Sequence, residues 1–531
     1  MCPKQRNFGL YFQNMKNIMG KSRDVVLKTR SVSGIKILNY YKGDREQWAK
    51  MKVGRAAAGA AIDGVLKYVN HGDDRTKALL NLTDFVQKFT GNMFAEKTFD
   101  NIRTMLQNPD NKWVQYVNRG LDELDPQVIK MTALNLGFQA AFVGTKQIRM
   151  NREKYNCNIP WTMLVDPTSA CNLHCTGCWA AEYGHKLNLS YEKLSDIVSQ
   201  GKELGTYFYM FTGGEPLVRK KDILRLAEEH HDCEFHCFTN GTLIDEEFCE
   251  AVQKLGNISF SLSLEGFEEV NDGRRGAGIF DKVLAAMDLM KKHGLLFGTS
   301  ICYTRANLET VTSDEFLDLL IEHGCRYSWY FHFMPVGMDA APELMPTVEQ
   351  RKYIYHRLRE IRSDKSDKQI FVMDFQNDGE FVGGCIAGGR NYCHINANGD
   401  VEPCVFIHYS SANINEVSLL EALQQPLFQA YRDGQPFNRN HLRPCPMLEN
   451  PELLREMVEK TGAKSTDLQS PESAEHLCGK CDLYAAEWKK AADELWAENP
   501  HHKQRYQNYK KENLDEEAKA STEEILSGIR G

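Results

Sequence analysis

The segment from Trp161 to Trp179, WTMLVDPTSACNLHCTGCW, joins a short apolar run to a loop that holds three cysteines. The apolar run has the length and composition of a buried strand. The loop places Cys171, Cys175 and Cys178 with three and then two residues between them. Three neighbouring thiolates suit an iron–sulfur cluster or a zinc ion, because soft sulfur ligands favour both. A four-iron cluster held by three thiolates would leave one iron open to a further ligand.

This segment contains the first of six apolar runs, and helical stretches follow the first five of them. Such alternation is typical of parallel βα units, in which each strand is followed by a loop and a helix. We therefore predict an α/β fold built on a partial (βα)6 TIM-type barrel, with its chemistry in the loops at the carboxyl ends of the strands. The predicted strands begin at Trp161, Thr206, Glu234, Ile258, Phe297 and Tyr327.

Local signals mark the ends of several predicted helices. Thr312 and Glu315 have the spacing of a capping box and are predicted to begin the fifth helix of the barrel. Gly256, Gly294 and Gly324 follow apolar helical stretches. They are predicted to end these helices, because glycine tolerates the left-handed conformation that closes many helix ends.

The loop sequence CNLHCTGC resembles the CxxxCxxC signature of the radical S-adenosylmethionine (SAM) superfamily, and its place after the first strand agrees with that family. The resemblance implies that the three cysteines hold a [4Fe-4S] cluster and that SAM binds its open iron. It further implies anaerobic, reductive cleavage of SAM to a 5′-deoxyadenosyl radical, which abstracts hydrogen from an unactivated carbon. The chain departs from the family pattern in having Gly177 before the third cysteine and Trp179 after it. The alternative is a zinc site with a distant fourth ligand, or three unrelated thiols.

Gly213, Gly214, Glu215 and Pro216 form the loop after the second predicted strand. By itself this run indicates a turn, but one βα unit after the cysteine loop it resembles the family segment that receives the amino group of SAM. The resemblance also makes five loop and strand residues candidates for SAM binding. For each of them the alternative is a satisfied polar group of the core or a surface turn. These five are Asn240, Ser261, Ser263, Ser300 and Arg275.

A second set of cysteines follows the predicted barrel. The segment GCIAGGRNYCHINANGDVEPC resembles the start of the SPASM or twitch domains that hold auxiliary iron–sulfur clusters after many radical SAM barrels. The later part departs from the SPASM pattern, because it has only one isolated cysteine and a single CxxC pair. We therefore expect one auxiliary [4Fe-4S] cluster rather than two, with a zinc site or unliganded thiols as the alternative. The candidate ligands are Cys385, Cys404 and Cys445, with a fourth from Cys393 or from the pair Cys478 and Cys481.

Five more cysteines lie within predicted strands and helices and have no ligand spacing. They are expected to be core thiols, which behave as small apolar groups. These are Cys233, Cys237, Cys249, Cys302 and Cys325.

The sequence DFQNDG lies between the barrel and the second cysteine set and carries Asp374, Asn377 and Asp378. Asp374 and Asp378 are candidate catalytic residues at the entrance for the substrate. The alternative is a turn in which Asp and Asn side chains cap their own main chain.

Composition and charge narrow the class of protein. The chain has 531 residues, 16 cysteines and a net charge of −8, from 64 basic and 72 acidic residues. This balance gives no general attraction to nucleic acid, so no nucleic-acid partner is predicted. No apolar run is long enough to span a bilayer and no signal peptide is recognisable, so we expect a cytoplasmic protein. In that compartment, clustered cysteines indicate metal binding rather than disulfides.

The amino-terminal part of the chain is predicted to be helical. Apolar residues recur at helical spacing to about residue 155, for example from Pro126 to Gly144. The first sixty residues carry thirteen Lys or Arg and only three Asp or Glu. This excess of positive charge predicts either a solvated arm or peripheral contact with an anionic membrane surface.

We expect four regions: a helical region at 1–155, the radical SAM barrel at 156–345, a SPASM- or twitch-like domain at 346–490 and a charged tail at 491–531. The resemblance implies an enzyme that acts on a large substrate, a peptide or protein, with a membrane lipid as the alternative. A non-enzymatic iron–sulfur electron carrier is the alternative of another class. The implied electron donor is a protein such as flavodoxin or ferredoxin, and the reaction outcome stays open.

Overall fold

The computed structural model describes residues 54–68, 75–90, 96–180, 184, 186–337 and 340–499. The chain divides into two compact units, residues 1–56 and 57–531, and the elements named here belong to the second. The basic run predicted to meet a membrane surface lies almost wholly outside the described residues.

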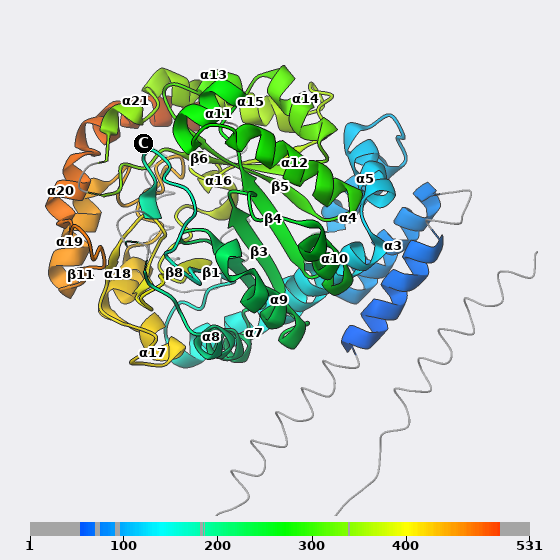
Figure 1. Cartoon of the computed structure of the whole chain (residues 1–531), viewed down its shortest axis with the longest axis horizontal. Helices are drawn as coiled ribbons and strands as arrows, with labels where there is room; N and C mark the ends of the chain where they lie inside the picture. Colours follow the sequence, from blue (N-terminus) through cyan, green and yellow to red (C-terminus); the bar gives the residue numbers. More distant parts are fainter. Residues whose placement is uncertain are drawn as a thin grey trace, which may run out of the picture. The chain divides into compact units, whose positions relative to one another are not determined.

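A nine-stranded sheet forms the centre of the second unit, in the order β7-β6-β5-β4-β3-β2-β1-β8-β9 (Figure 1). Neighbouring strands are parallel from β7 to β8, and β9 runs antiparallel to β8. The consecutive order from β1 to β6 confirms the predicted α/β fold with its series of parallel units. The strands are β1 (Thr162–Val165), β2 (Phe208–Phe211), β3 (Glu234–Thr239), β4 (Ile258–Ser263), β5 (Phe297–Tyr303), β6 (Tyr327–His332), β7 (Phe371–Asp374), β8 (Tyr392–Ile395) and β9 (Val401–Glu402).

Helices connect the parallel strands and cover the outer face of the sheet (Figure 1). Their apolar faces pack inward; in α8, for example, Leu194, Ile197, Val198 and Leu204 are buried. The connecting helices are α8 (Tyr191–Leu204), the 3₁₀-helix η5 (Pro216–Arg219), α9 (Lys220–Glu229), α10 (Glu246–Leu255), α11 (Glu268–Arg275), α12 (Ile279–Lys292), α13 (Leu308–Val311), α14 (Asp314–Glu322), η6 (Pro342–Leu344) and α15 (Val348–Arg362).

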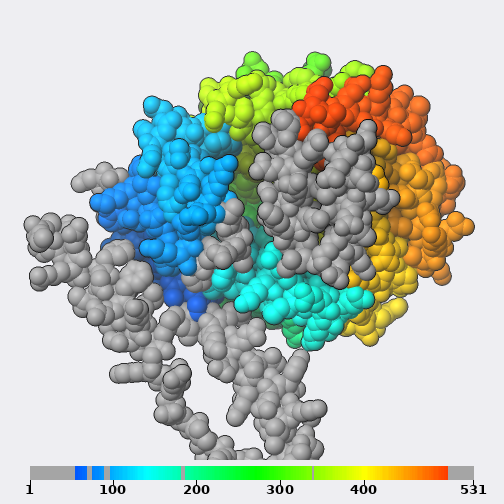
Figure 2. Space-filling view, turned by 180° about the vertical axis from the view of Figure 1, so that it is seen from behind, coloured from blue at the N-terminus to red at the C-terminus, as the bar shows by residue number. Residues whose placement is uncertain are grey.

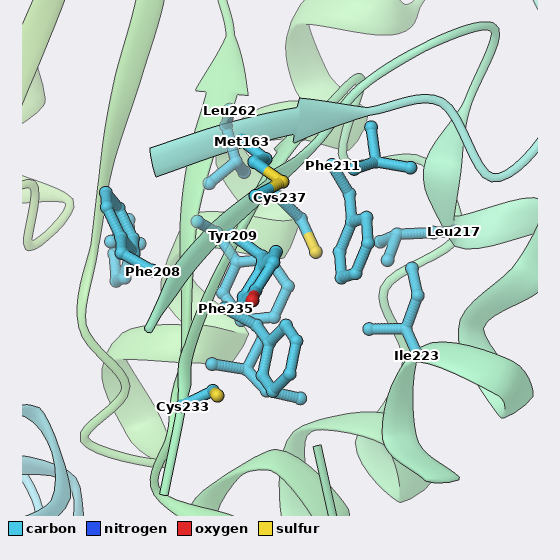
Figure 3. Close-up of a cluster of buried hydrophobic side chains, with 14 of the residues drawn as sticks. Met163, Phe208, Tyr209, Phe211, Leu217, Ile223, Cys233, Phe235, Cys237 and Leu262 are labelled. Atoms are coloured by element: carbon cyan, nitrogen blue, oxygen red, sulfur yellow. The ribbon is translucent and has the colours of Figure 1, made fainter. Parts of the chain in front are cut away.

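An apolar core lies between the sheet and these helices. Tyr209 and Phe211 of β2 stack on Phe235 of β3, with ring centroids 5.9 and 5.7 Å apart (Figure 3). Successive side chains of a strand face opposite sides, so Phe208 points away from this core, as Figure 3 shows. Phe208 and Met210 therefore face the interior of the barrel.

The predicted core thiols lie mostly where the sequence places them. Cys233, Cys237, Cys249 and Cys325 are buried, and Figure 3 shows the first two in the core. Cys302 differs, because it is only half-buried and lines a cavity inside the barrel. Its position on β5 turns its side chain inward.

Helices precede the barrel, which confirms the predicted helical region for its described part. Residues 57–68 are also helical. Within the described residues, no helix is both long and apolar enough to cross a membrane. The further elements are α3 (Arg75–Thr90), α4 (Glu96–Leu106), α5 (Lys112–Glu123), α6 (Pro126–Thr132), the π-helix η3 (Ala133–Gly144) and α7 (Thr145–Tyr155).

These helices pack against the amino-terminal ends of the strands. The Arg119 side chain donates hydrogen bonds to the carbonyls of Cys325 and Gln369, which precede β6 and β7, at 3.1 and 2.9 Å. Asn135 donates to the carbonyl of Cys233, just before β3, at 2.8 Å. Figure 2 shows the light-blue residues of α5 beside the yellow-green residues that include α15. The amino-terminal helices therefore form the floor of the barrel.

Ser313 caps α14, with its hydroxyl accepting from the main-chain N–H of Phe316 at 3.2 Å. The Thr312 hydroxyl instead donates to the carbonyl of Leu308 at 2.8 Å. The predicted capping box of Thr312 and Glu315 is wrong by one residue, because Ser313 caps the helix. Thr312 and Ser313 both carry a hydroxyl, and the hydroxyl of Thr312 is already bonded to α13. The predicted helix-ending glycines are confirmed, with positive φ angles at residues 256, 294 and 324.

The C-terminal region packs against the barrel. The predicted boundary at 345 precedes β7 and β8, which join the barrel sheet. The predicted boundary at 490 falls inside α21, where Ala491, Ala492 and Leu495 are buried. The elements of this region are α16 (Gly379–Val382), β10 (Tyr409–Ser410), α17 (Leu419–Leu423), α18 (Pro426–Gly434), α19 (Pro451–Thr461), β11 (Lys464–Ser465), α20 (Ala474–Gly479) and α21 (Asp482–Glu498).

A buried ion pair joins these parts. Arg351 of α15 lies 2.6 Å from Glu449, and neither side chain is exposed to solvent. The guanidinium also donates to Asn377 at 2.9 Å and lies 4.1 Å from the ring centroid of Trp488. Glu449 accepts from the main-chain N–H of Cys445 at 2.7 Å. The pair therefore ties α15, the turn after β7, α21 and the Cys445 loop together.

We expect Arg351→Met to lower the free energy of unfolding by about 3–5 kcal/mol, because it leaves the Glu449 carboxylate buried without its partner. Urea denaturation followed by tryptophan fluorescence measures this. The double variant Arg351→Met with Glu449→Gln should recover most of the loss, since it removes both charges. A single variant as stable as the wild type would contradict the expectation.

Candidate active site

A cavity of about 1470 Å³ occupies the interior of the barrel. It extends from the cysteine loop, at the carboxyl ends of the strands, to the helices of the floor. Small-molecule sites usually occupy about 300–1,000 Å³, so this cavity has room for a cofactor together with a large substrate. Its end at the floor is lined by Met105, Trp113, Tyr116, Leu136 and Ile148.

Cys171, Cys175 and Cys178 line the other end of the cavity and are half-buried. The main-chain N–H of Leu173 donates to the Cys171 sulfur at 3.4 Å, and the Arg275 guanidinium lies 3.7 Å from the Cys175 sulfur. Both contacts favour a thiolate. Burial raises the pKa of the Cys171 thiol to about 11, so a bound metal would supply the charge that keeps it deprotonated.

Within the part of the chain that the structure describes, no group of three or more His, Cys, Asp or Glu side chains has the geometry of a metal site. The assignment of ligands therefore rests on position and chemistry. Three thiols of one loop lie at a cavity wall with space beside them, at the end of the barrel where catalytic loops gather. They fit a cluster with one open iron.

Gly213 and Gly214 bring the loop after β2 against the start of the cysteine loop. The φ angle of Gly213 is 104°, and a Cβ atom on Gly214 would lie 2.2 Å from the carbonyl oxygen of Ala170. The N–H groups of Gly214 and Glu215 donate to the carbonyls of Thr168 and Ala170 at 3.0 and 2.8 Å. Glycine is needed here because the two loops touch, and this contact holds the cysteine loop in place.

The Glu215 carboxylate is buried and joins two loops of the barrel. It accepts from the main-chain N–H of Leu217 at 2.9 Å, from the Thr239 hydroxyl at 2.6 Å and from the N–H of Asn240 at 2.8 Å. Burial raises the pKa of Glu215, and these hydrogen bonds oppose the rise. Glu215 lines the cavity, whereas Pro216 is buried in η5 and does not.

The remaining candidates for SAM binding divide into two groups. Ser261 does not line the cavity, because it is fully buried and its hydroxyl shares a hydrogen bond with His236 Nε2 at 2.9 Å. The other four have the required position, and their contact with SAM stays a prediction. Those that line the cavity are Asn240, Ser263, Ser300 and Arg275.

Glu265 and Arg274, which sequence analysis missed, form a charged cluster with Arg275 at the cavity wall. Arg275 binds both oxygens of Glu265, and Arg274 Nη1 lies 2.9 Å from Glu265 Oε1. Burial alone would raise the pKa of Glu265, but the two arginines hold it below its ordinary value. The sequence could have indicated this cluster, because Glu265 directly follows the fourth strand and precedes Arg275 by ten residues.

Trp179, at the end of the cysteine loop, packs on a buried cluster of charges that sequence analysis also missed. Its ring centroid lies 5.9 Å from that of His394. The His394 ring lies between Asp166 at 3.0 Å and Glu402 at 2.5 Å. Burial would lower the pKa of His394, but these carboxylates raise it to about 10, so the ring is a cation at neutral pH. This cluster connects the cysteine loop with β8 and β9.

The thiols of the C-terminal region gather at one apolar cluster. Cys404, Cys478 and Cys481 are buried in this cluster together with Tyr431, and Cys385 and Cys445 pack against it. Burial, and then the charge of Glu449, raises the pKa of Cys445. This grouping fits an auxiliary cluster.

Cys393 and the CxxC pair were the alternatives for a fourth ligand. Cys393 of β8 lies in the barrel core, whereas Cys404, Cys478 and Cys481 share a second apolar cluster. The preceding residue, Tyr392, donates its hydroxyl to the Cys404 sulfur. Because neighbouring strand residues face opposite sides, Cys393 points away from the other thiols. This placement favours the CxxC pair.

Asp374 and Asp378 both line the cavity. Asp374 is fully buried at the end of β7 and accepts from the main-chain N–H and the side chain of Asn377 at 3.0 and 2.8 Å. Asp378 binds Arg362 at 2.6 Å and accepts from the N–H of Asp374 at 2.9 Å. These residues therefore form the self-capping turn, at a position where substrate could reach them. Their catalytic role stays a prediction.

Burial, and then the charge of Asp378, raises the pKa of Asp374 to about 6. The ordinary pKa of an Asp carboxyl is about 3.9, so the folded state binds the Asp374 proton more tightly than the unfolded state does. This proton therefore stabilises the folded state fully below about pH 4, and the stabilisation is lost as pH rises through about 6. We expect the wild type to lose about 1–3 kcal/mol of unfolding free energy relative to Asp374→Asn over this interval. Chemical denaturation of both proteins at several pH values measures this loss. An unfolding free energy that changes with pH equally in both proteins would contradict the raised pKa of Asp374.

Two family models match the chain. The radical SAM superfamily matches residues 165–322, and an iron–sulfur cluster-binding SPASM domain matches residues 385–447. The first domain binds a [4Fe-4S] cluster and SAM, and the second domain binds an auxiliary iron–sulfur cluster. The first span contains Cys171, Cys175 and Cys178, and the second contains Cys385, Cys404 and Cys445, whereas the pair Cys478 and Cys481 lies after it.

Three proteins are similar to this chain over about half of its length. An AdoMet-dependent heme synthase from Methanosarcina barkeri is 25% identical over 305 residues, which cover 52% of this chain and 86% of that protein. The mycofactocin maturase MftC from Mycolicibacterium smegmatis is 29% identical over 258 residues, or 46% of this chain and 64% of the maturase. The solved structure of SuiB from Streptococcus suis bound to SAM is 19% identical, covers 54% of this chain and 71% of SuiB, and has a TM-score of 0.47.

The thiol loop, the matched barrel and the second group of thiols agree with one another. The chain carries a domain of the radical SAM superfamily of enzymes, followed by an iron–sulfur cluster-binding domain of the SPASM type.

Proposed function

We propose that the protein cleaves SAM reductively at the loop of Cys171, Cys175 and Cys178 and abstracts hydrogen from an unactivated carbon of a large substrate. The observation that supports this most is that the three thiols and the Gly213–Glu215 loop meet at one end of a cavity of about 1470 Å³. When bound, the cluster and SAM supply a 5′-deoxyadenosyl radical. The substrate lies in the remaining space.

The protein's own residues hold the reacting groups and exclude water. Glu215 links the loops after β2 and β3, so the wall beside the thiols is rigid. Arg275 adds a positive charge beside Cys175, which offsets the negative charge of a thiolate-bound cluster. The apolar side chains of the cavity keep bulk water and oxidants from the reacting carbon.

The substrate is a peptide or protein in one hypothesis and a membrane lipid in the other. The names of the relatives do not distinguish between these two substrate classes, because one relative is named for heme synthesis and another for mycofactocin maturation. Each cleavage of SAM consumes one electron, for which a flavodoxin or ferredoxin is the proposed donor. The fate of the substrate radical depends on its placement in the cavity.

An iron–sulfur electron carrier would need neither an open iron nor a large cavity beside it. We expect the anaerobically reconstituted protein, with dithionite and SAM, to form 5′-deoxyadenosine and methionine in equal amounts. Liquid chromatography with mass detection measures both products. If protein with its full iron content forms no nucleoside, the electron carrier is the better hypothesis.

A further inference from the structure

A continuous line of rings follows the inner wall of the barrel. It begins at Trp161, near the floor, and ends at Trp179, beside the cysteine loop, and all its members line the cavity. Consecutive ring centroids along the line lie 4.9 to 6.4 Å apart. The rings between the two tryptophans are Phe208, His236, Phe238, Phe331, Phe375 and Phe406.

Two polar side chains of this wall, His236 and Tyr327, have hydrogen-bond partners within the protein. The two ring nitrogens of His236 share hydrogen bonds with Ser259 and Ser261, each at 2.9 Å, and burial lowers the pKa of His236 to about 3, so the ring is neutral. Tyr327 donates its hydroxyl to the carbonyl of Phe260 at 2.8 Å. A peptide would bring an N–H and a carbonyl with every residue, and each would need a partner when buried. A hydrocarbon chain needs none.

Arginines and apolar side chains share another edge of the cavity, between α7 and the segment that includes α16. Arg152 of α7 donates to the carbonyl of Arg390, and Arg390 donates to the carbonyl of Val382 at 2.8 Å. Arg149 of α7 is exposed and lines the cavity. Phe381 and Val382, which are 48% and 41% exposed, line the same cavity. Guanidinium groups next to exposed apolar groups suit a ligand with an anionic head and an apolar chain.

We propose that the substrate is a lipid with a long hydrocarbon chain and an anionic carboxylate or phosphate head. The head lies at the arginine edge, where Arg149 meets it, and the chain follows the rings toward the cysteine loop. There a C–H bond of the chain breaks, its hydrogen atom joins the 5′ carbon of the deoxyadenosyl radical, and the unpaired electron stays on the chain carbon. This substrate class rests on the proposed function.

Tryptophan fluorescence tests the binding without any catalysis. Trp161, Trp179 and Trp329 line the cavity, and bromine quenches tryptophan on contact. Titration of the full-length reconstituted protein with phosphatidylglycerol that carries a brominated stearoyl chain should quench part of the emission, and the unbrominated lipid should not. Trp329→Phe should reduce the quenched part, whereas Trp496→Phe, outside the cavity, should leave it unchanged. Equal quenching in Trp329→Phe and wild type would overturn the proposal.

The head group is tested by charge reversal on α7. Arg149→Glu should raise the lipid concentration for half-quenching by at least about fivefold, because a cation near an anionic head contributes about 1 kcal/mol. Lys146→Glu is the matched control, since Lys146 is exposed on the same helix and does not line the cavity. The brominated choline lipid should bind more weakly than the glycerol lipid. An unchanged Arg149→Glu titration would overturn the assignment.

Catalysis adds a second readout. With a lipid whose chain is fully deuterated, 5′-deoxyadenosine should gain deuterium. If the loaded protein forms 5′-deoxyadenosine but shows neither quenching nor deuterium transfer, the lipid class is wrong and the peptide class is favoured. If the loaded protein forms no 5′-deoxyadenosine at all, the proposed function itself fails.

Discussion

Alanine at Cys171, Cys175 and Cys178 together is expected to abolish dithionite-driven formation of 5′-deoxyadenosine. The iron content should fall from about eight to about four atoms per chain, because one of two four-iron clusters loses its protein ligands. The effect should be complete, since no other described thiol lines the same end of the cavity except Cys302, which lies on a strand. Iron analysis and nucleoside quantification after anaerobic reconstitution measure both changes.

Two buried thiols provide the matched control. Cys249→Ala and Cys325→Ala remove sulfur from the apolar core, away from the cavity. Both variants should keep their iron and their SAM cleavage. A triple variant with unchanged iron would show that the cysteine loop holds no cluster, and it would favour an electron carrier or a zinc protein.

Alanine at Cys385, Cys404 and Cys445 is expected to remove about four irons while the cluster of the barrel remains. These thiols lie in the C-terminal region, and the main-chain N–H groups of Met447 and Leu448 donate to the Cys445 sulfur at 3.4 Å. Such hydrogen bonds to ligand sulfurs stabilise clusters. Cleavage of SAM with dithionite should persist, because the loop of the other three thiols is intact.

Cys393→Ala is the control for this variant. Its thiol faces the barrel core, so the variant should retain all its iron. Cys478→Ala and Cys481→Ala, measured separately, identify which member of the CxxC pair is the fourth ligand by the loss of iron. If Cys393→Ala loses about four irons and both CxxC variants keep theirs, the placement of the fourth ligand is wrong.

Much of the fold could be predicted because its signals are local. Each of the first six strands is an apolar run bounded by a loop, so the runs that begin near Trp161 and Tyr327 marked the limits of the series. β7 and β8 were not predicted, although they are as long as β1 and β2, with four residues each. They belong to the sheet through their pairing with β6 and β1, which the local sequence does not show.

The same distinction holds for the candidate site. The cysteine spacing and the glycine–glutamate loop were legible because their residues are adjacent in the chain. The His394 cluster and the gathering of the C-terminal thiols were not, because their members are separated by tens to hundreds of residues. Charges so far apart in the chain give no joint pattern until packing buries them together.

The sequence by itself determined the radical SAM and SPASM motifs, the order of the first six barrel strands and the existence of a second cysteine region, because short motifs and apolar periodicity specify them. Only the tertiary structure decided that Cys393 faces the barrel core, that Ser261 is covered by His236 and that aromatic rings line the cavity up to Trp179. The physical reason is that the direction of a side chain depends on strand pairing and on the curvature of the sheet. Both arise from contacts between distant segments, and no local run of residues contains them.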